Sequence, residues 1–158
     1  MCFHNSMSAK TLKLAARYGR KSDVVEIYQD ILNEQYHVSA FNYPKYPIIT
    51  TSDEVQVFNW GLIPFWTKNE ASADKIRRMT INARADTLFD KPSFREPIMK
   101  KRCLVPSTGY FEWRHEGSRK IPYYIYLKNE EIFSMAGIYD SWFDKETGME
   151  YYTFSIIT

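Results

Sequence analysis

The strongest constraint on the fold is a series of short strand-like segments that fills the chain from residue 36 to its end. These segments are rich in β-branched and aromatic residues and are bounded by turn residues. They lie at residues 36–41, 48–51, 55–60, 102–106, 110–113, 122–127, 132–138 and 149–158. Glu116-Gly117, Asn129-Glu130 and Thr147-Gly148 are typical turn sequences between them. The series predicts a mainly antiparallel, β-rich fold.

Two helices are predicted before the strands, which makes the expected fold class α+β. The first is expected to begin with Ser8 as its N-cap and to run to Tyr18, with Gly19 as its stop. The second is expected to begin near Asp23, with Glu26 at capping-box spacing. Its apolar stripe comprises Val24, Tyr28, Ile31 and Gln35, with Val25 and Leu32 beside it, so this helix is expected to pack against another part of the protein. Residues 67–79 are polar and are predicted to form a loop.

The length of 158 residues fits one domain spanning residues 1–158. The aromatic share of 16% indicates β-rich packing with some rings left for a binding groove, and the net charge of +2 permits an anionic partner without requiring one. Cys2 and Cys103 are the only cysteines, so neither a disulfide scaffold nor a zinc site is expected. We expect no metal, no cofactor, no membrane span and a reduced cytoplasmic setting.

The first two residues, Met1-Cys2, permit a specific chemistry. Removal of Met1 would expose an α-amine and a thiol on adjacent carbons, and both are partly in reactive form near neutral pH. Such an aminothiol condenses with an aldehyde to an imine, which the thiol then closes to a thiazolidine ring. The alternative is that Cys2 is incidental. The basic, acid-free segment 1–22 can also mimic a transit peptide, whose cleavage would remove Cys2.

Three further segments carry candidate functional residues. Glu112 lies within an aromatic strand, where a carboxylate is costly unless it is paired or protonated; a salt bridge on a solvated face is the alternative. Asn82 and Arg84 follow a short strand and can face a cleft, or serve as a cap and a surface charge. The bend at residues 60–66, between Trp60 and Trp66, is either a core corner or a platform on which bases stack.

Taken in order, these segments resemble the SOS-response-associated peptidase (SRAP) family of abasic-site-processing proteins. The matching segments are Met1-Cys2, 60–66, 81–87 and 109–113, and the resemblance extends over the whole chain. The resemblance implies a pseudo-symmetric β-rich fold with a positively charged groove for single-stranded DNA. It also implies that Met1 is removed and that Cys2 becomes covalently bound to DNA at an abasic site. This linkage would shield the lesion in the DNA damage response, and failure of ring closure would give lyase behaviour.

The resemblance also assigns the site residues. Cys2, Asn82 and Glu112 match the catalytic positions: Glu112 would transfer protons, and Asn82 would hold the sugar and the terminal amine. The residues expected to contact DNA are His4, Asn42, Pro44, Trp66, Arg84 and Trp113. His4 stands where the family often has an arginine, so the phosphate contact of that arginine would be replaced only in part.

The family also carries a catalytic histidine in a His-x-x-Arg-Met-Pro-like motif downstream of the strand that ends here at Thr158. No histidine of this chain lies in such a motif, and the C-terminal part of the family domain is therefore expected to be missing.

The leading hypothesis is a monomeric, cytoplasmic protein that associates with the nucleoid when it crosslinks to abasic sites in single-stranded DNA. It requires the start of the chain to lie near Glu112 and Asn82. The second hypothesis is an N-terminal-nucleophile cysteine peptidase, with removal of Met1 as an autocatalytic step. The third is a non-catalytic module that binds single-stranded DNA reversibly, with strong salt dependence.

Overall fold

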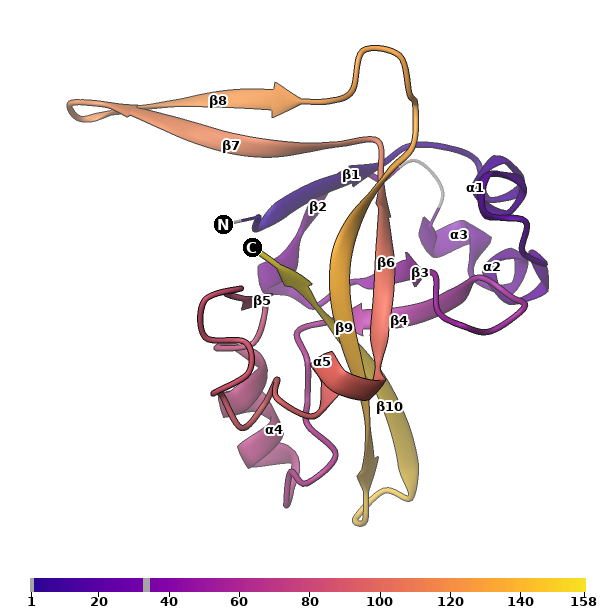
Figure 1. Ribbon diagram of the computed structural model, residues 1–158, viewed down its shortest axis with the longest axis vertical. Helices are drawn as coiled ribbons and strands as arrows, with labels where there is room; N and C mark the ends of the chain where they lie inside the picture. Colours follow the sequence, from indigo (N-terminus) through magenta and orange to yellow (C-terminus); the bar gives the residue numbers. More distant parts are fainter. Residues whose placement is uncertain (1, 33–34) are drawn as a thin grey trace.

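The computed structural model describes residues 2–32 and 35–158, so Met1 and its predicted removal lie outside the described residues. The described chain forms two β-sheets with a few short helices around them, which confirms the α+β, mostly β fold (Figure 1). The helices are α1 (Thr11–Tyr18), α2 (Asp23–Ile27), α3 (Gln29–Leu32), the 3-10 helix η1 (Ala40–Asn42), α4 (Glu70–Arg77) and α5 (Pro97–Lys100). No helix in residues 2–32 and 35–158 is both long enough and apolar enough to cross a membrane.

Within the described chain, one sheet has four strands and the other has six. The four-stranded sheet runs in the order β2 (Gln35–Ser39), β1 (His4–Met7), β7 (Gly109–Glu116) and β8 (Arg119–Ile125). The six-stranded sheet runs in the order β3 (Lys45–Ile48), β4 (Gln56–Trp60), β10 (Met149–Ile157), β9 (Phe133–Asp144) and β6 (Arg102–Ser107), with β5 (Asn82–Ala83) also on β10. The pairings are antiparallel except for those of β10 with β4 and β5, so the prediction of a mainly antiparallel fold is confirmed.

The predicted turns form, but one of them joins the two sheets. Gly117 and Gly148 adopt positive φ angles of 60° and 72° at the β7–β8 and β9–β10 turns, a conformation that glycine adopts without strain. The turn after β8 instead leads from one sheet to the other, because β8 pairs with β7 whereas β9 pairs with β6 and β10. A turn sequence therefore identifies the end of a strand but not its partner.

The N-terminal helices differ from the prediction in their bounds and buried sides. α1 begins at Thr11 rather than at Ser8, because Ser8 instead contacts Thr108, with its backbone nitrogen 3.2 Å from Thr108 Oγ1. Gly19 ends this helix in the left-handed conformation, as predicted. The second predicted helix is interrupted at Tyr28 and becomes α2 and α3.

The second helix packs as predicted, but mainly through the two residues named beside the stripe. The buried positions are Val25 and Leu32, whereas Ile31 is 53% exposed. The reason is the interruption between α2 and α3, across which the spacing of one continuous helix does not hold.

The segment predicted as a loop at residues 67–79 contains α4, which is a second correction. The Asn69 side chain caps this helix by accepting a hydrogen bond from the Ser72 backbone nitrogen at 3.0 Å. Ala73 is the buried residue of the helix. A helix with so small an apolar side has no hydrophobic periodicity to detect in the sequence.

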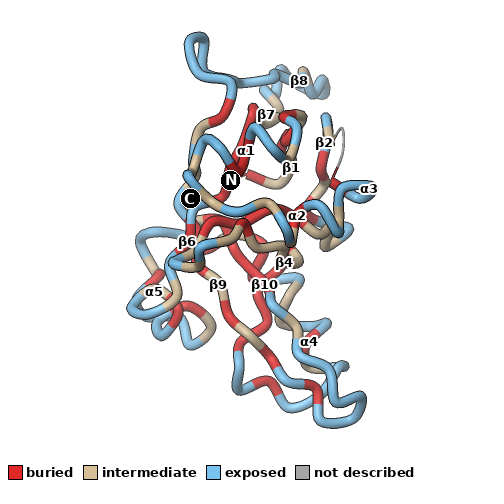
Figure 2. Tube along the Cα trace, turned by 90° about the vertical axis from the view of Figure 1, so that its right-hand side faces the viewer, coloured by how far each residue is buried: buried red, intermediate tan, exposed pale blue. Residues whose placement is uncertain are grey.

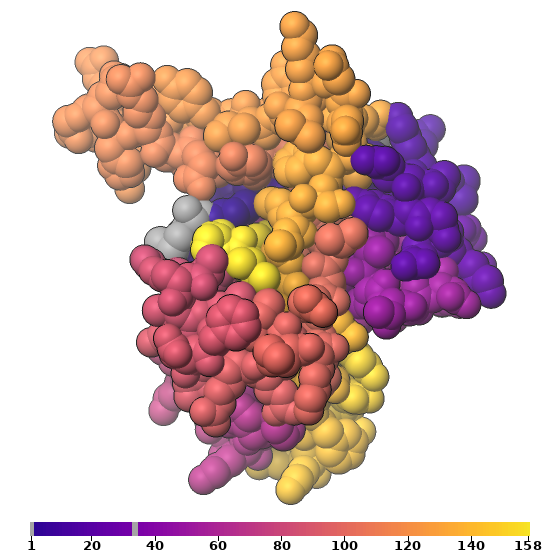
Figure 3. Space-filling model, viewed as in Figure 1, coloured from indigo at the N-terminus to yellow at the C-terminus, as the bar shows by residue number. Residues whose placement is uncertain are grey.

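The β7–β8 hairpin projects from the body of the molecule as a two-stranded arm (Figure 1). β1 pairs with β7 only at Asn5–Tyr110 and Ser6–Gly109, so β7 continues past the start of β1 with β8 as its paired neighbour. Most of the arm is exposed, whereas the junction of the two sheets is buried (Figure 2). The arm therefore lies above the start of β1 (Figure 1, Figure 3).

Candidate functional site

Cys2 lies two residues before the start of β1, the strand that pairs with β7 at Asn5–Tyr110 and Ser6–Gly109. Its residue is 6% exposed, and its Sγ lies 3.8 Å from the backbone oxygen of His4. Burial, and next the negative charge of Glu112, raise the pKa of the Cys2 thiol to about 11, while the hydrogen bond to His4 opposes the shift. The thiol is therefore protonated at neutral pH, and Glu112 is near enough to influence it.

A cavity of about 550 Å³ opens beside this start of the chain. Its lining comes from the residues before and at the start of β1 and from the arm: Phe3, His4, Glu112, Trp113, His115 and Lys120. The Trp113 ring meets the His4 ring edge-on, with 4.7 Å between the ring centroids. The structure thus brings together three residues that the sequence singled out, His4, Glu112 and Trp113.

His4 does not supply the fixed charge of an arginine. Burial, and next the neighbouring His37, lower the pKa of His4 from its ordinary 6.5, whereas Glu112 raises it. His4 Nδ1 lies 2.9 Å from His37 Nε2, so one imidazole donates to the other. At neutral pH His4 is therefore suited to hydrogen bonding and ring stacking rather than to ion pairing with a phosphate.

A second cavity, of about 440 Å³, contains the other predicted group of Trp66, Asn82 and Arg84. The Asn82 side chain is the notable member, because its Nδ2 and Oδ1 atoms are buried without a hydrogen-bond partner among the described residues. Such an amide is unusual in a folded protein and can bond to a ligand that enters the cavity. Arg84 is exposed and its Nη2 lies 2.5 Å from Asp86 Oδ2, so a phosphate would compete with this carboxylate.

Strand pairing relates the second cavity to the start of the chain. Asn82 and Ala83 of β5 pair in parallel with Ile156 and Ile157 at the end of β10. The end of β10 lies close to the start of β1 in both ribbon views (Figure 1, Figure 2). In the space-filling view, the residues of the C-terminus, the segment around residue 85 and the arm surround one region of the surface (Figure 3).

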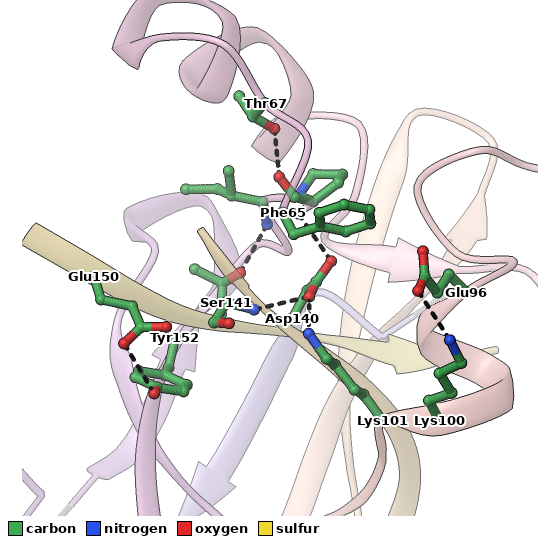
Figure 4. Close-up of polar contacts among 12 residues, drawn as sticks. Phe65, Thr67, Glu96, Lys100, Lys101, Asp140, Ser141, Glu150 and Tyr152 are labelled. Atoms are coloured by element: carbon green, nitrogen blue, oxygen red, sulfur yellow. Dashed lines mark hydrogen bonds and ion pairs between the residues drawn. The ribbon is translucent and has the colours of Figure 1, made fainter. Parts of the chain in front are cut away.

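The corner that presents Trp66 is held by a buried carboxylate that the sequence reading missed. Asp140 of β9 accepts hydrogen bonds from the Phe65 backbone nitrogen at 2.9 Å and from Lys101 Nζ at 2.5 Å (Figure 4). Asp140 is 1% exposed. The sequence pattern that could have identified Asp140 is the one that singled out Glu112: an acidic residue within an apolar and aromatic strand.

The two alternatives for the segment 60–66 each hold for one tryptophan. Trp60 is fully buried and its Nε1 donates to the backbone oxygen of Ile81 at 2.9 Å, so it belongs to the core. Trp66 is 46% exposed and lines the second cavity. A single motif thus contains one structural and one accessible ring.

Asn42 and Pro44 line neither of these two cavities. Asn42 is exposed at the end of η1, and the backbone oxygen of Pro44 accepts a hydrogen bond from the Trp60 nitrogen at 2.9 Å. The loop contacts α4 through Tyr43, whose ring lies 3.8 Å from the Arg77 guanidinium carbon. The structure thus gives Pro44 and Tyr43 structural contacts.

The described residues contain no group of three or more histidine, cysteine, aspartate or glutamate side chains that could hold a metal ion. Cys103, the other cysteine, is buried on β6, and burial raises the pKa of its thiol to about 12. In contrast to Cys2, the shift of Cys103 has burial alone as its cause.

A two-sheet fold with a cysteine at its first strand and a glutamate beside it defines a known class of protein. Residues 1–158 match the family described as SOS response associated peptidase (SRAP), and the chain belongs to this family. It is 39% identical over 145 residues to the abasic site processing protein YoqW of Bacillus subtilis, covering 86% of this chain and 62% of that protein. It is 37% identical over 118 residues to the abasic site processing protein HMCES of Gallus gallus, covering 63% of this chain and 35% of that protein.

Solved structures support the same fold. A crystal structure of a protein from Bacteroides thetaiotaomicron is 78% identical and superposes with a TM-score of 0.97, over 99% of this chain and 67% of that one. A protein from Bordetella bronchiseptica shares the fold at 17% identity, with a TM-score of 0.78 over 99% of this chain and 71% of that one. The chain spans 62–64% of the length of the Bacillus subtilis relatives that it matches.

Proposed function

We propose that this protein, once Met1 is removed, bonds covalently through Cys2 to abasic sites in single-stranded DNA and thereby shields them in the cytoplasm and nucleoid. The observation that carries the proposal is the placement of Cys2 before β1, within reach of the charge of Glu112 and beside a cavity that Glu112 lines. The names of the relatives, abasic site processing proteins, support the choice of substrate.

The proposed reaction begins with the α-amine of Cys2. An abasic sugar exists partly as a ring-opened aldehyde, and the amine would attack its C1′ carbon to form a carbinolamine. Loss of water gives an imine. The thiol then adds across the carbon–nitrogen double bond: sulfur bonds to C1′ and the thiol proton passes to nitrogen. One aldehyde and one aminothiol thus give one thiazolidine and one water, with no oxidant or reductant.

The raised pKa of the thiol fits this order of steps. A thiol with a pKa of about 11 is neutral at pH 7, so the amine is the better first nucleophile and the thiol follows with its own proton. Glu112 would transfer protons during ring opening and loss of water. If the thiol fails to add, the imine can undergo β-elimination, which would give a lyase side activity.

The other candidate residues would bind the DNA or the terminal amine rather than react with the sugar. The amide of Asn82, whose atoms have no partner among the described residues, would hold the sugar or the terminal amine. Arg84 would contact a phosphate beside the lesion, in exchange for Asp86. Trp113 and His4 would contact the nucleotides at the mouth of the first cavity, and Trp66 those at the second.

The proposal predicts a covalent product between the purified protein and a single-stranded oligonucleotide that contains one abasic site. The product should survive denaturing electrophoresis, and Cys2→Ala should abolish it. Cys103→Ala is the matched control, since it removes the other buried thiol, which lies on β6 and does not line the first cavity, and it should crosslink like the unmodified protein. Glu112→Gln should slow the reaction by about 10²–10⁴-fold.

The outcome with Cys2→Ala decides between the hypotheses. If Cys2→Ala crosslinks as stably as the unmodified protein, the thiazolidine mechanism is wrong. The intact mass of the same preparation shows whether Met1 is absent, and retention of Met1 in Glu112→Gln alone would indicate that the protein removes this residue itself.

A further inference from the structure

The four-stranded sheet carries a row of aromatic rings that crosses all of its strands. Measured between ring centroids, Tyr124 of β8 lies 4.9 Å from Phe111 of β7, and Phe111 lies 5.1 Å from His37 of β2. His37 in turn lies 4.9 Å from His4 of β1. Tyr126 extends the row at one end, with 5.6 Å between its ring and that of Tyr124. Trp113 contacts His4 at 4.7 Å.

Strand register places these rings on one face of the sheet. Phe111 is paired directly with Tyr124, and Asn5 with Tyr110, so His4, the neighbour of Asn5, lies on the side of Phe111. The opposite face holds Asn5 and Val38, which are 0% and 5% exposed and pack into the body of the protein. The aromatic face therefore points outward, and its rings at the edge, Tyr124 and Tyr126, are 44% and 62% exposed.

This outer face is continuous with the first cavity. His4 and Trp113 belong both to the row of rings and to the cavity lining. The arm adds a cation on this face, since Lys120 is exposed on β8, is paired with His115 on the side of Phe111, and lines the cavity. Rings on a sheet surface, beside a cation and leading to a proposed abasic-site pocket, match the chemistry of unpaired nucleotides, which offer flat bases and a charged backbone.

We propose that the outer face of β2, β1, β7 and β8 is a stacking surface for the unpaired bases that flank the lesion. This inference rests on the proposed function for the identity of the strand. Tyr124, Tyr126 and His37 would stack on bases, while Lys120 contacts a phosphate. The proposal adds three residues that lie outside the cavity and a direction along which the strand leaves it, across the sheet toward the base of the arm.

The choice of test positions follows from the contacts. Tyr124 is unsuitable, because its hydroxyl donates to the Thr108 backbone oxygen at 3.1 Å and its ring covers Gly109. Tyr126 and His37 are exposed and can be replaced with less effect on packing. Tyr152 is a matched control: it is 44% exposed, is also a tyrosine with a stacked ring neighbour, and lies on β10 of the six-stranded sheet, outside the proposed surface.

The experiment measures reversible binding of a fluorescent, lesion-free oligothymidylate of about 12 nucleotides, a length within the range that single-strand-binding folds cover. We expect Tyr126→Ala and His37→Ala each to weaken binding by roughly five- to tenfold, Tyr126→Phe to restore it, and Tyr152→Ala to bind like the unmodified protein. A 2-aminopurine placed in the oligonucleotide should be quenched on binding, and less so with Tyr126→Ala, because stacking quenches this base.

Two results would overturn the inference. One is binding by Tyr126→Ala and His37→Ala equal to that of Tyr152→Ala. The other is a stable dimer in light scattering that Tyr126→Ala converts to a monomer, because the face would then be covered by a second copy. A lesion-free strand cannot form the thiazolidine, so failure of crosslinking in the earlier experiment would refute the proposed function without affecting this measurement.

Discussion

In the six-stranded sheet, Tyr46, Trp60 and Phe154 are fully buried and their rings lie within about 6 Å of one another, whereas in the four-stranded sheet Tyr124 and Tyr126 are 44% and 62% exposed. Both sheets therefore contain clusters of aromatic residues, but the cluster in the six-stranded sheet is buried, whereas the one in the four-stranded sheet is exposed to solvent. The high aromatic share of the sequence is divided between a core and an open surface.

The difference follows from how each sheet is covered. The six-stranded sheet packs against the rest of the body, and there the buried Trp60 Nε1 donates to the backbone oxygen of Ile81. The four-stranded sheet buries one face and leaves the other uncovered by the described chain. Rings in the first location stabilise the fold, and rings in the second are available to a partner.

The largest effect should come from a buried ring. Trp60→Ala should lower the free energy of unfolding by about 3–5 kcal/mol, because it removes a fully buried side chain and leaves a cavity. The measurement is urea denaturation followed by circular dichroism. Trp66→Ala is the control within the same motif, and since Trp66 is 46% exposed, it should cost far less. Equal costs for the two substitutions would refute the division of this motif into a core ring and an accessible ring.

The sequence was sufficient to locate most strands, but it did not predict which sheet each strand joins. Alternation and turn residues located β7, β9 and β10, and the glycine turns at Gly117 and Gly148 are confirmed. The short-range pattern carries no information on which edge a strand joins, so the transfer of the chain from β8 to β9 between sheets was not predictable. Helix α4 was missed because its stability comes from a cap and a single small buried residue.

The candidate site was located only through the resemblance to a family. Local patterns singled out Glu112 as a carboxylate in an aromatic strand, and the structure places it beside Cys2. The electrostatic effect of Glu112 on Cys2, 110 positions apart in the sequence, depends on how β1 lies against β7, and no local pattern encodes that pairing. The row from Tyr126 to His37 was missed for the same reason, since its rings come from three strands and the segment after β8.

The two cysteines extend the comparison to pH. The unfolded thiols have an ordinary pKa of 9.0, but in the folded protein burial raises the pKa of Cys103 to about 12, and burial together with Glu112 raises that of Cys2 to about 11. Between these values the unfolded state binds fewer protons than the folded state, so stability falls as pH rises. The contribution is fully present below pH 9 and should decline by about 2–3 kcal/mol per thiol by pH 11.

Denaturation of the unmodified protein and of each cysteine variant at pH 8 and pH 11 measures this decline. Cys103→Ala and Cys2→Ala should each reduce the difference between the two pH values, and Cys103→Ala should reduce it more. Glu112→Gln should lower the pKa of the Cys2 thiol and leave Cys103 unaffected, because Glu112 acts on Cys2 alone of the two. A decline that is the same in both cysteine variants as in the unmodified protein would contradict the assignment.

The smallest effect on stability should come from the outer face of the four-stranded sheet. Tyr126 is 62% exposed and contacts the Tyr124 ring, so Tyr126→Ala should change the free energy of unfolding by no more than about 0.5 kcal/mol. The same denaturation experiment measures it. A loss of 2 kcal/mol or more, roughly the range of a core substitution, would mean that this ring supports the fold. A small loss of stability together with weaker binding of single-stranded DNA would instead show that this ring serves binding and not the fold. The aromatic residues would then divide into core rings that stabilise the protein and surface rings that bind a partner.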